Sequence, residues 1–104
     1  MKVVLTIGGS DSCSGAGIQA DLKTFAAHGL YGISTVTAVT AQSPSRITTM
    51  HIIPSEIITA QIDTVLDDIS ITGVKTGMLG KCDIVNSVAS VSYTHLTLPT
   101  ICSV

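Results

Sequence analysis

Residues 6–25 read TIGGSDSCSGAGIQADLKTF, and the spacing of apolar residues changes within this stretch. Residues 3–7 form a short β-branched run that is typical of a buried parallel strand. Beyond the glycines, apolar residues recur at helical spacing from Ile18 to Phe25, and Gly29 is well suited to end that helix. The stretch therefore predicts a strand, a glycine-rich loop and a helix in direct succession.

The rest of the chain continues to alternate between strand and helix patterns. Three further strands are expected, at residues 33–41, 48–53 and 71–76. A helix is expected after Pro54, with Ser55 as its N-cap and an end close to Ser70, and another helix near Asp83. Strands that alternate with helices predict βαβ crossovers and a mainly parallel sheet covered on both faces, so the expected fold class is α/β.

The composition excludes several classes of function. A chain of 104 residues with 45% hydrophobic and 12% charged residues predicts one domain, or a piece of one, with a core. The net charge of −2 and the scattered Lys and Arg residues form no basic stripe, so nucleic acid is not an expected partner. The apolar N-terminal run is too short to span a membrane, and we expect a cytoplasmic protein without a membrane partner. No metal site is predicted, because the Cys and His residues have no ligand spacing.

The glycine-rich loop is compatible with more than one kind of site. A Walker A loop needs Lys and then Ser or Thr directly after its last glycine, but Gly17 is followed by Ile and Gln, which excludes it. Residues 15–20 fit the dinucleotide-binding pattern G-x-G-x-x-A, yet no carboxylate follows Asp21 until Glu56 to hold a ribose. Dinucleotide binding therefore stays open only as a weaker alternative.

A small-molecule pocket agrees better with the pattern. The carboxyl ends of parallel strands share one edge of a sheet, where ligands bind. Residues 8–11, Gln42 and residues 77–78 are each expected at that edge, one group after each strand. Gln42 offers an amide that matches the edge of an aminopyrimidine, and Met78 offers an adaptable apolar face. Asp21 flanks the apolar face of its helix and could accept a hydrogen bond from a substrate hydroxyl.

Each of these residues also has a purely structural interpretation. Asp11 would make an Asx-turn or cap the helix, Asp21 would be solvated near a helix N-terminus, and Met78 would belong to the core. Gln42 alone would be an ordinary polar loop residue. The joint pocket is favoured because it requires all of them at one edge.

The character of the sequence changes after residue 90. Residues 91–104, VSYTHLTLPTICSV, are rich in Thr and Ser and interrupt a half-formed amphipathic helix. They could form an ordinary edge strand. However, VSYTHLTLPT is similar to translated sequencing-adapter remnants at the ends of unrelated predicted proteins, and we favour that interpretation. Residues 1–90 are then the domain, and residues 91–104 are a non-native tail.

Two motifs resemble a known family. Residues 6–42, which end in TAVTAQ, and residues 74–80, VKTGMLG, are similar to the N-terminal part of the hydroxymethylpyrimidine kinase/phosphomethylpyrimidine kinases. These are the thiamine-biosynthesis members of the ribokinase-like superfamily. The resemblance covers residues 1–90 and implies a three-layer ribokinase-like fold with a mainly parallel sheet, of which only the N-terminal portion is present. Family members usually have glycine where this chain has Ser14.

The resemblance also implies a function. Such enzymes use ATP and Mg²⁺ to phosphorylate 4-amino-5-hydroxymethyl-2-methylpyrimidine and then its monophosphate. By position in the motifs, substrate-binding roles are implied for Gly9, Ala16, Asp21, Gln42 and Met78. The family's general base and glycine-rich anion hole belong to a C-terminal half whose motifs do not occur here, so no catalytic residue is expected and the chain alone is expected to be inactive.

Two alternatives to this function remain. One is a pyridoxal-type kinase of the same superfamily, because the same pocket could accommodate another hydroxymethyl heterocycle. The other is a nucleotide-binding α/β module without kinase activity. Relatives are often dimers, so the resemblance implies a homodimer for the full-length protein.

Overall fold

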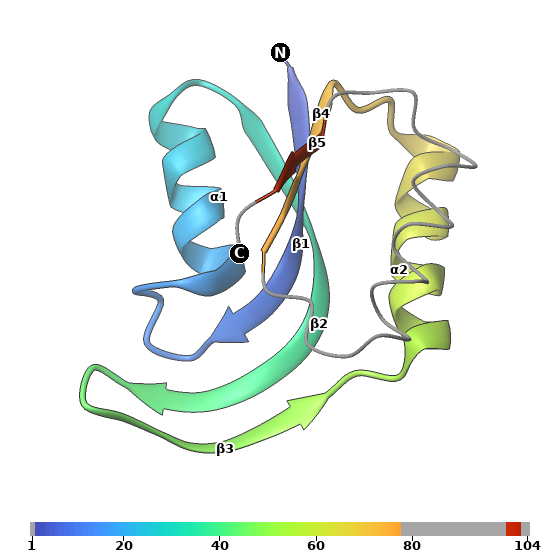
Figure 1. Cartoon of the computed structure of the whole chain (residues 1–104). Helices are drawn as coiled ribbons and strands as arrows, with labels where there is room; N and C mark the ends of the chain where they lie inside the picture. Colours follow the sequence, from blue (N-terminus) through green and yellow to red (C-terminus); the bar gives the residue numbers. More distant parts are fainter. Residues whose placement is uncertain (1, 78–99, 103–104) are drawn as a thin grey trace.

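The computed structural model describes residues 2–77 and 100–102, which form a sheet with one helix on each face (Figure 1). The elements in chain order are β1 (Val3–Asp11), α1 (Gly17–Ala27), β2 (Tyr31–Ser43), β3 (Arg46–Ile52), α2 (Ser55–Asp68), β4 (Gly73–Thr76) and β5 (Thr100–Cys102). The strand order is β3-β2-β1-β4-β5, in which only the pair of β2 and β3 is antiparallel. The predicted α/β class and mainly parallel sheet are confirmed.

The first strand is longer than the sequence pattern indicates. β1 continues to Asp11, so the glycine pair does not end it as predicted. Between Gly8 and Gly9 the pairing with β2 skips one residue of β2, Thr37. Such a bulge bends the strand locally and lets the ladder continue beyond it. The glycines therefore lie inside the sheet, and not in the loop that follows it.

Two further boundaries differ from the expectation. Gln42 lies inside β2, which ends at Ser43, and not after the strand. The predicted N-cap role of Ser55 is wrong, because Pro54 is the N-cap of α2 and no side chain caps the helix. The carbonyl oxygen of Pro54 already accepts the N–H of Ile58 at 3.2 Å, which makes Ser55 the first helical residue. The ends of both helices agree with the prediction: α2 stops at Asp68, and Gly29 takes a left-handed φ of +73° just beyond α1.

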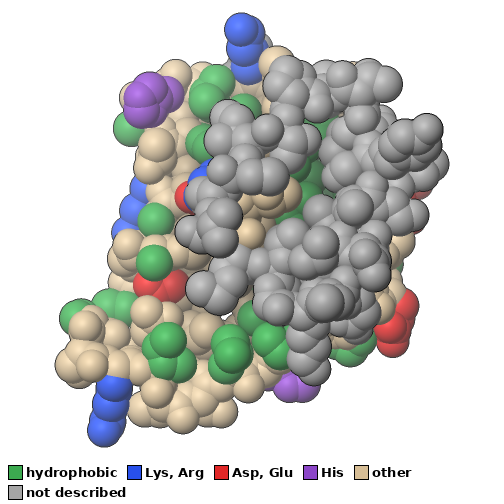
Figure 2. Space-filling view, in the orientation of Figure 1, with side chains coloured by type: hydrophobic (Ala, Val, Ile, Leu, Met, Phe, Trp, Pro, Cys, Tyr) green, Lys and Arg blue, Asp and Glu red, His purple; other side chains and the backbone are tan. Residues whose placement is uncertain are grey.

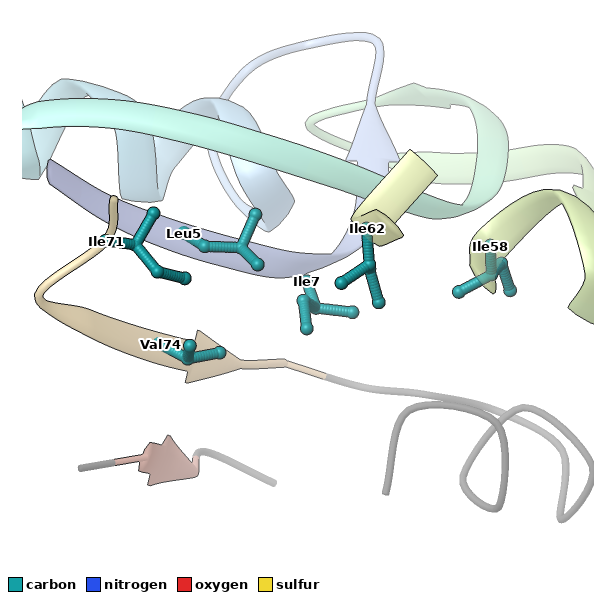
Figure 3. Packing of buried hydrophobic residues seen from close by; sticks show 6 residues of the cluster. All are labelled: Leu5, Ile7, Ile58, Ile62, Ile71 and Val74. Carbon is teal, nitrogen blue, oxygen red and sulfur yellow. The ribbon is translucent and has the colours of Figure 1, made fainter. Parts of the chain in front are cut away.

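The hydrophobic core lies between the sheet and α2 (Figure 3). Its fully or nearly buried members come from β1, α2, β4 and the segment before β4: Leu5, Ile7, Ile58, Ile62, Ile71 and Val74. Because side chains alternate along a strand, Leu5 and Ile7 face α2 while Thr6 faces α1.

α1 packs closely on the opposite face of the sheet. A Cβ atom at Gly32 of β2 would lie 2.7 Å from Leu22 Cδ2 and 3.0 Å from Phe25 Cδ2. Only glycine leaves room for the helix at this distance, and this packing brings the neighbouring Asp21 over the sheet.

The described part of the tail forms β5, which pairs in parallel with β4. This pairing agrees with the edge-strand alternative, while the origin of residues 91–104 stays a prediction. The predicted helix near Asp83 lies outside the described residues. Within the described part of the chain, neither helix is long and apolar enough to cross a membrane.

Candidate functional site

A cavity of about 420 Å³ opens at the carboxyl ends of the parallel strands β1, β2 and β4. The start of α1 and strand β3 close its sides. Its lining residues are Gly8, Gly9, Ser10, Asp11, Ala16, Gly17, Asp21, Thr37, Ala38, Thr40, Gln42, Ile47, Met50, Ile52, Lys75 and Gly77. A volume in this range suits a small organic ligand. The cavity lies at the sheet edge where the sequence predicts a pocket.

Four of the five predicted substrate-binding residues line this cavity. They are Gly9, Ala16, Asp21 and Gln42. The fifth, Met78, lies outside the described residues. The structure therefore brings together residues from β1, α1 and β2, and their role in binding stays a prediction.

Asp11 builds the loop between β1 and α1. Its Oδ1 accepts the N–H of Cys13 at 2.8 Å, and its Oδ2 accepts the N–H of Ala16 at 2.9 Å. The residue is only 5% exposed, and both carboxylate oxygens are used inside the loop. The Asx-turn interpretation of Asp11 is confirmed.

The same loop contains two residues with left-handed backbone conformations. Ser14 and Gly17 both have φ of +65°. A Cβ at Gly17 would lie 2.4 Å from the carbonyl oxygen of Gly9, so glycine is required there. Ser14 pays a steric cost for a conformation that glycine adopts freely, which gives a physical meaning to the family's glycine at this position.

Gln42 is positioned through its backbone. The hydroxyl of Ser12 donates to the Gln42 carbonyl oxygen and accepts the Gln42 N–H, both at 2.7 Å. The Thr40 hydroxyl lies 2.8 Å from the carbonyl oxygen of Ser10 and 3.2 Å from Oε1 of Gln42. A hydroxyl has one proton, so the closer carbonyl competes for it. The side-chain amide of Gln42 thus keeps most of its hydrogen-bonding capacity for a ligand.

Asp21 already has two partners. The hydroxyl of Thr6 donates to its Oδ2 at 2.7 Å, and the ammonium of Lys75 forms an ion pair with its Oδ1. The side chains of Lys75 and Asp21 are 25% and 15% exposed. A substrate hydroxyl that donates to Asp21, as expected, would therefore bind a carboxylate that is already paired with an ammonium group.

Sequence reasoning missed Lys75. Its charge could have drawn attention to it. Lys75 lies between Val74 and Thr76 in a short inner strand, so its side chain must face a helix on one side of the sheet. Its partner could not be read from the sequence, since Asp21 is 54 positions away.

Strand β3 supplies an apolar wall that the sequence pattern also missed. Ile47, Met50 and Ile52 line the cavity, and hydrophobic side chains gather over the hairpin at the lower edge of the molecule in Figure 2. The pairing of β2 with β3 skips Thr48. Odd-numbered residues before Thr48 therefore lie on the same face of the strand as even-numbered residues after it. A strict alternation would have separated Ile47 from Met50.

The described residues do not fit a metal ion. They contain no group of three or more His, Cys, Asp or Glu side chains that could hold one. Both cavity carboxylates have other partners, since Asp11 accepts loop N–H groups and Asp21 pairs with Lys75.

Comparison with known families identifies the chain. The family model described as phosphomethylpyrimidine kinase matches residues 11–103. The chain belongs to the phosphomethylpyrimidine kinase family. A hydroxymethylpyrimidine/phosphomethylpyrimidine kinase of Haemophilus influenzae is 52% identical over 89 residues, which are 86% of this chain and 33% of that relative. The chain spans about a third of the length of the bacterial kinases of this name that it matches.

Solved structures confirm the ribokinase-like fold of this family member. The crystal structure of phosphomethylpyrimidine kinase from Clostridium difficile 630 matches with a TM-score of 0.95 and 39% identity, over 99% of this chain and 45% of that one. Pyridoxal kinase from Staphylococcus aureus, in complex with AMP-PCP and pyridoxal, matches with a TM-score of 0.86 and 34% identity, over 99% of this chain and 39% of that one. The fold is thus shared by kinases named for two different heterocycles.

Proposed function

We propose that this chain is the pyrimidine-binding part of an ATP-dependent kinase of thiamine biosynthesis. The kinase would phosphorylate 4-amino-5-hydroxymethyl-2-methylpyrimidine and then its monophosphate. The observation that carries the proposal is the single cavity in which Gly9, Ala16, Asp21 and Gln42 meet in a member of this family. All four positions belong to motifs that extend over three separate elements.

The cavity suits a flat ring with one polar edge. The amide of Gln42 can donate to and accept from an aminopyrimidine, while Ile47 and Met50 provide an apolar surface for the ring face. Gly9 and Ala16 contribute no long side chains to the lining of the cavity. We expect the hydroxymethyl group to lie on the side of the cavity that Asp21 and its partner Lys75 line.

ATP belongs to the proposal as the phosphoryl donor, and Mg²⁺ as its counter-ion. The described residues do not fit Mg²⁺, so no metal-binding role is assigned to them. Phosphoryl transfer depends mostly on positioning and charge stabilisation. We expect the groups that provide these to lie in the part of the relatives that this chain does not match, so that the chain alone binds pyrimidine without phosphorylating it.

A pyridoxal-type kinase is the second candidate. It is favoured by the structural match to the Staphylococcus aureus pyridoxal kinase, whose named ligand also carries a hydroxymethyl group on a six-membered heterocycle. The family model and the names of the relatives favour the pyrimidine. The third possibility, a nucleotide-binding module without kinase activity, predicts a preference for NAD over either heterocycle.

Calorimetric titration of the 104-residue chain with hydroxymethylpyrimidine, pyridoxal and NAD separates these candidates. We expect hydroxymethylpyrimidine to bind most tightly. Tightest binding of pyridoxal would replace the first candidate by the second, and tight binding of NAD would contradict both kinase functions.

The proposal also includes a cytoplasmic location and a homodimer of the full-length protein. β3 is an outer strand of the described sheet, and such a strand offers unpaired backbone groups to a second copy. Sedimentation velocity at increasing concentration measures this directly. A full-length protein that stays monomeric at high concentration would contradict the dimer.

A further inference from the structure

The cavity contains one cationic side chain among its described lining residues, Lys75. The structure gives the ammonium of Lys75 a single partner among the described residues, Oδ1 of Asp21. A lysine ammonium has three N–H donors, so this ion pair leaves donors available. The side chain is 25% exposed and can be reached from the cavity.

The position of this ammonium is set by three elements of the fold. Thr6 and Lys75 are direct partners in the pairing of β1 with β4. The fully buried Thr6 donates its hydroxyl to Asp21 of α1 at 2.7 Å, and the other oxygen of that carboxylate holds Lys75. Lys75 is therefore fixed at the wall of the cavity, unlike an ordinary surface lysine.

The two substrates of the proposed function differ most in charge. The hydroxymethyl group is neutral, whereas a phosphate monoester carries a charge of about −1.5 to −2 at neutral pH. An isolated Asp21 would repel that phosphate. Paired with Lys75, it forms a site without net charge that still presents N–H donors.

We propose that Lys75 is the specificity-determining residue that admits the phosphomethyl substrate to this cavity. Its free N–H donors bind the phosphate, while Asp21 and Thr6 hold the ammonium in place. This inference rests on the proposed function, because it places the reacting end of the pyrimidine beside Asp21.

The test measures two dissociation constants of the 104-residue chain and takes their ratio. One is for hydroxymethylpyrimidine (the alcohol), and the other is for its phosphate ester (the monophosphate). Lys75→Met should shift this ratio against the monophosphate by about 10- to 100-fold, as expected for the loss of a charge-assisted hydrogen bond. Lys75→Arg should keep most of the preference, because a guanidinium also binds phosphate. Lys23→Met, at an exposed position of α1 that does not line the cavity, is the matched control and should leave the ratio unchanged.

The double variant Asp21→Asn with Lys75→Met controls for misfolding of the single variant, because it leaves no unpaired charge at the site. It should still disfavour the monophosphate, but by less than Lys75→Met alone, because the unpaired carboxylate that repels phosphate is also gone. A ratio that is unchanged in both Lys75→Met and the double variant overturns the inference.

Methyl phosphate, titrated by NMR, separates this inference from the proposed function. Binding of methyl phosphate that is lost in Lys75→Met, without binding of the pyrimidine alcohol, contradicts the proposed function and supports the role of Lys75. Binding of the alcohol without binding of the monophosphate or methyl phosphate supports the proposed function and contradicts the role of Lys75. A wild-type chain that binds none of the three overturns both.

Discussion

The side-chain amide of Gln61 in α2 forms two hydrogen bonds with the backbone of Val36 in β2. Its Nε2 donates to the Val36 carbonyl oxygen at 2.9 Å, and the Val36 N–H donates to its Oε1 at 2.9 Å. Ile52, the last residue of β3, pairs with Ala38, so Val36 lies beyond the end of that ladder. Gln61 thus supplies the backbone of β2 with the partners that a neighbouring strand would supply, and it fastens α2 to the sheet.

Replacement of Gln61 by Ala should destabilise the chain by about 2–3 kcal/mol, because two partly buried backbone groups lose their partners. Urea denaturation measures this loss, and hydrogen exchange should show faster exchange of the Val36 amide. Thr64→Ala, at an exposed position of the same helix, is the control and should change stability by less than about 0.5 kcal/mol. Equal stability of the two variants would show that the two hydrogen bonds between Gln61 and Val36 contribute nothing to stability.

Gly17→Ala and Gly29→Ala together separate steric collision from backbone strain. Both glycines have left-handed φ, but a Cβ at Gly17 meets the Gly9 carbonyl oxygen at 2.4 Å, while nothing lies within 4 Å of a Cβ at Gly29. Gly29→Ala should cost about 1–2 kcal/mol, and Gly17→Ala should cost a further 1–3 kcal/mol or so. The comparison uses the denaturation midpoints of the two variants. If Gly17→Ala is no worse than Gly29→Ala, the loop must move freely, which would contradict its described geometry.

Ser14→Gly should stabilise the chain. Relief of the left-handed conformation at Ser14 gains about 1–2 kcal/mol, and the greater freedom of glycine in the unfolded chain removes part of it, so the net gain is about 0.5–1 kcal/mol. Ser34→Gly, the same chemical change in the interior of β2, should instead destabilise by about 0.5–1 kcal/mol. Thermal denaturation of both variants gives the two signs. A loss of stability in Ser14→Gly would show that the serine side chain compensates for its strain.

Gln42→Ala should weaken pyrimidine binding by about 1–3 kcal/mol, because the polar edge of the ring loses its partner in the cavity. Calorimetry with hydroxymethylpyrimidine is the measurement. Thr49→Ala, on the opposite face of the hairpin, keeps the fold of β2 and β3 and should leave the affinity unchanged. An unchanged affinity in Gln42→Ala would remove this residue from the site.

Local patterns predicted the order of the elements well. The alternation of β-branched runs with helical spacing depends on residues that are close in the chain, so it identified β1, α1, β2 and α2 before any contact was known. The strand ends were less accurate, because glycines that usually interrupt a strand are held in β1 by hydrogen bonds to β2. Tertiary pairing overrode the local preference of Gly8 and Gly9.

The amino-acid pattern alone was enough to predict the fold class, the family and the sheet edge at which Gly9 and Gln42 gather, because parallel topology puts strand ends together. Which side chains contact one another depends on the packing of segments that are distant in the chain. The pairing of Asp21 with Lys75 depends on the register between β1 and β4, and the joint contribution of Ile47 and Met50 to the apolar wall depends on a bulge. Register and bulges arise from packing between distant segments, and no local periodicity encodes them.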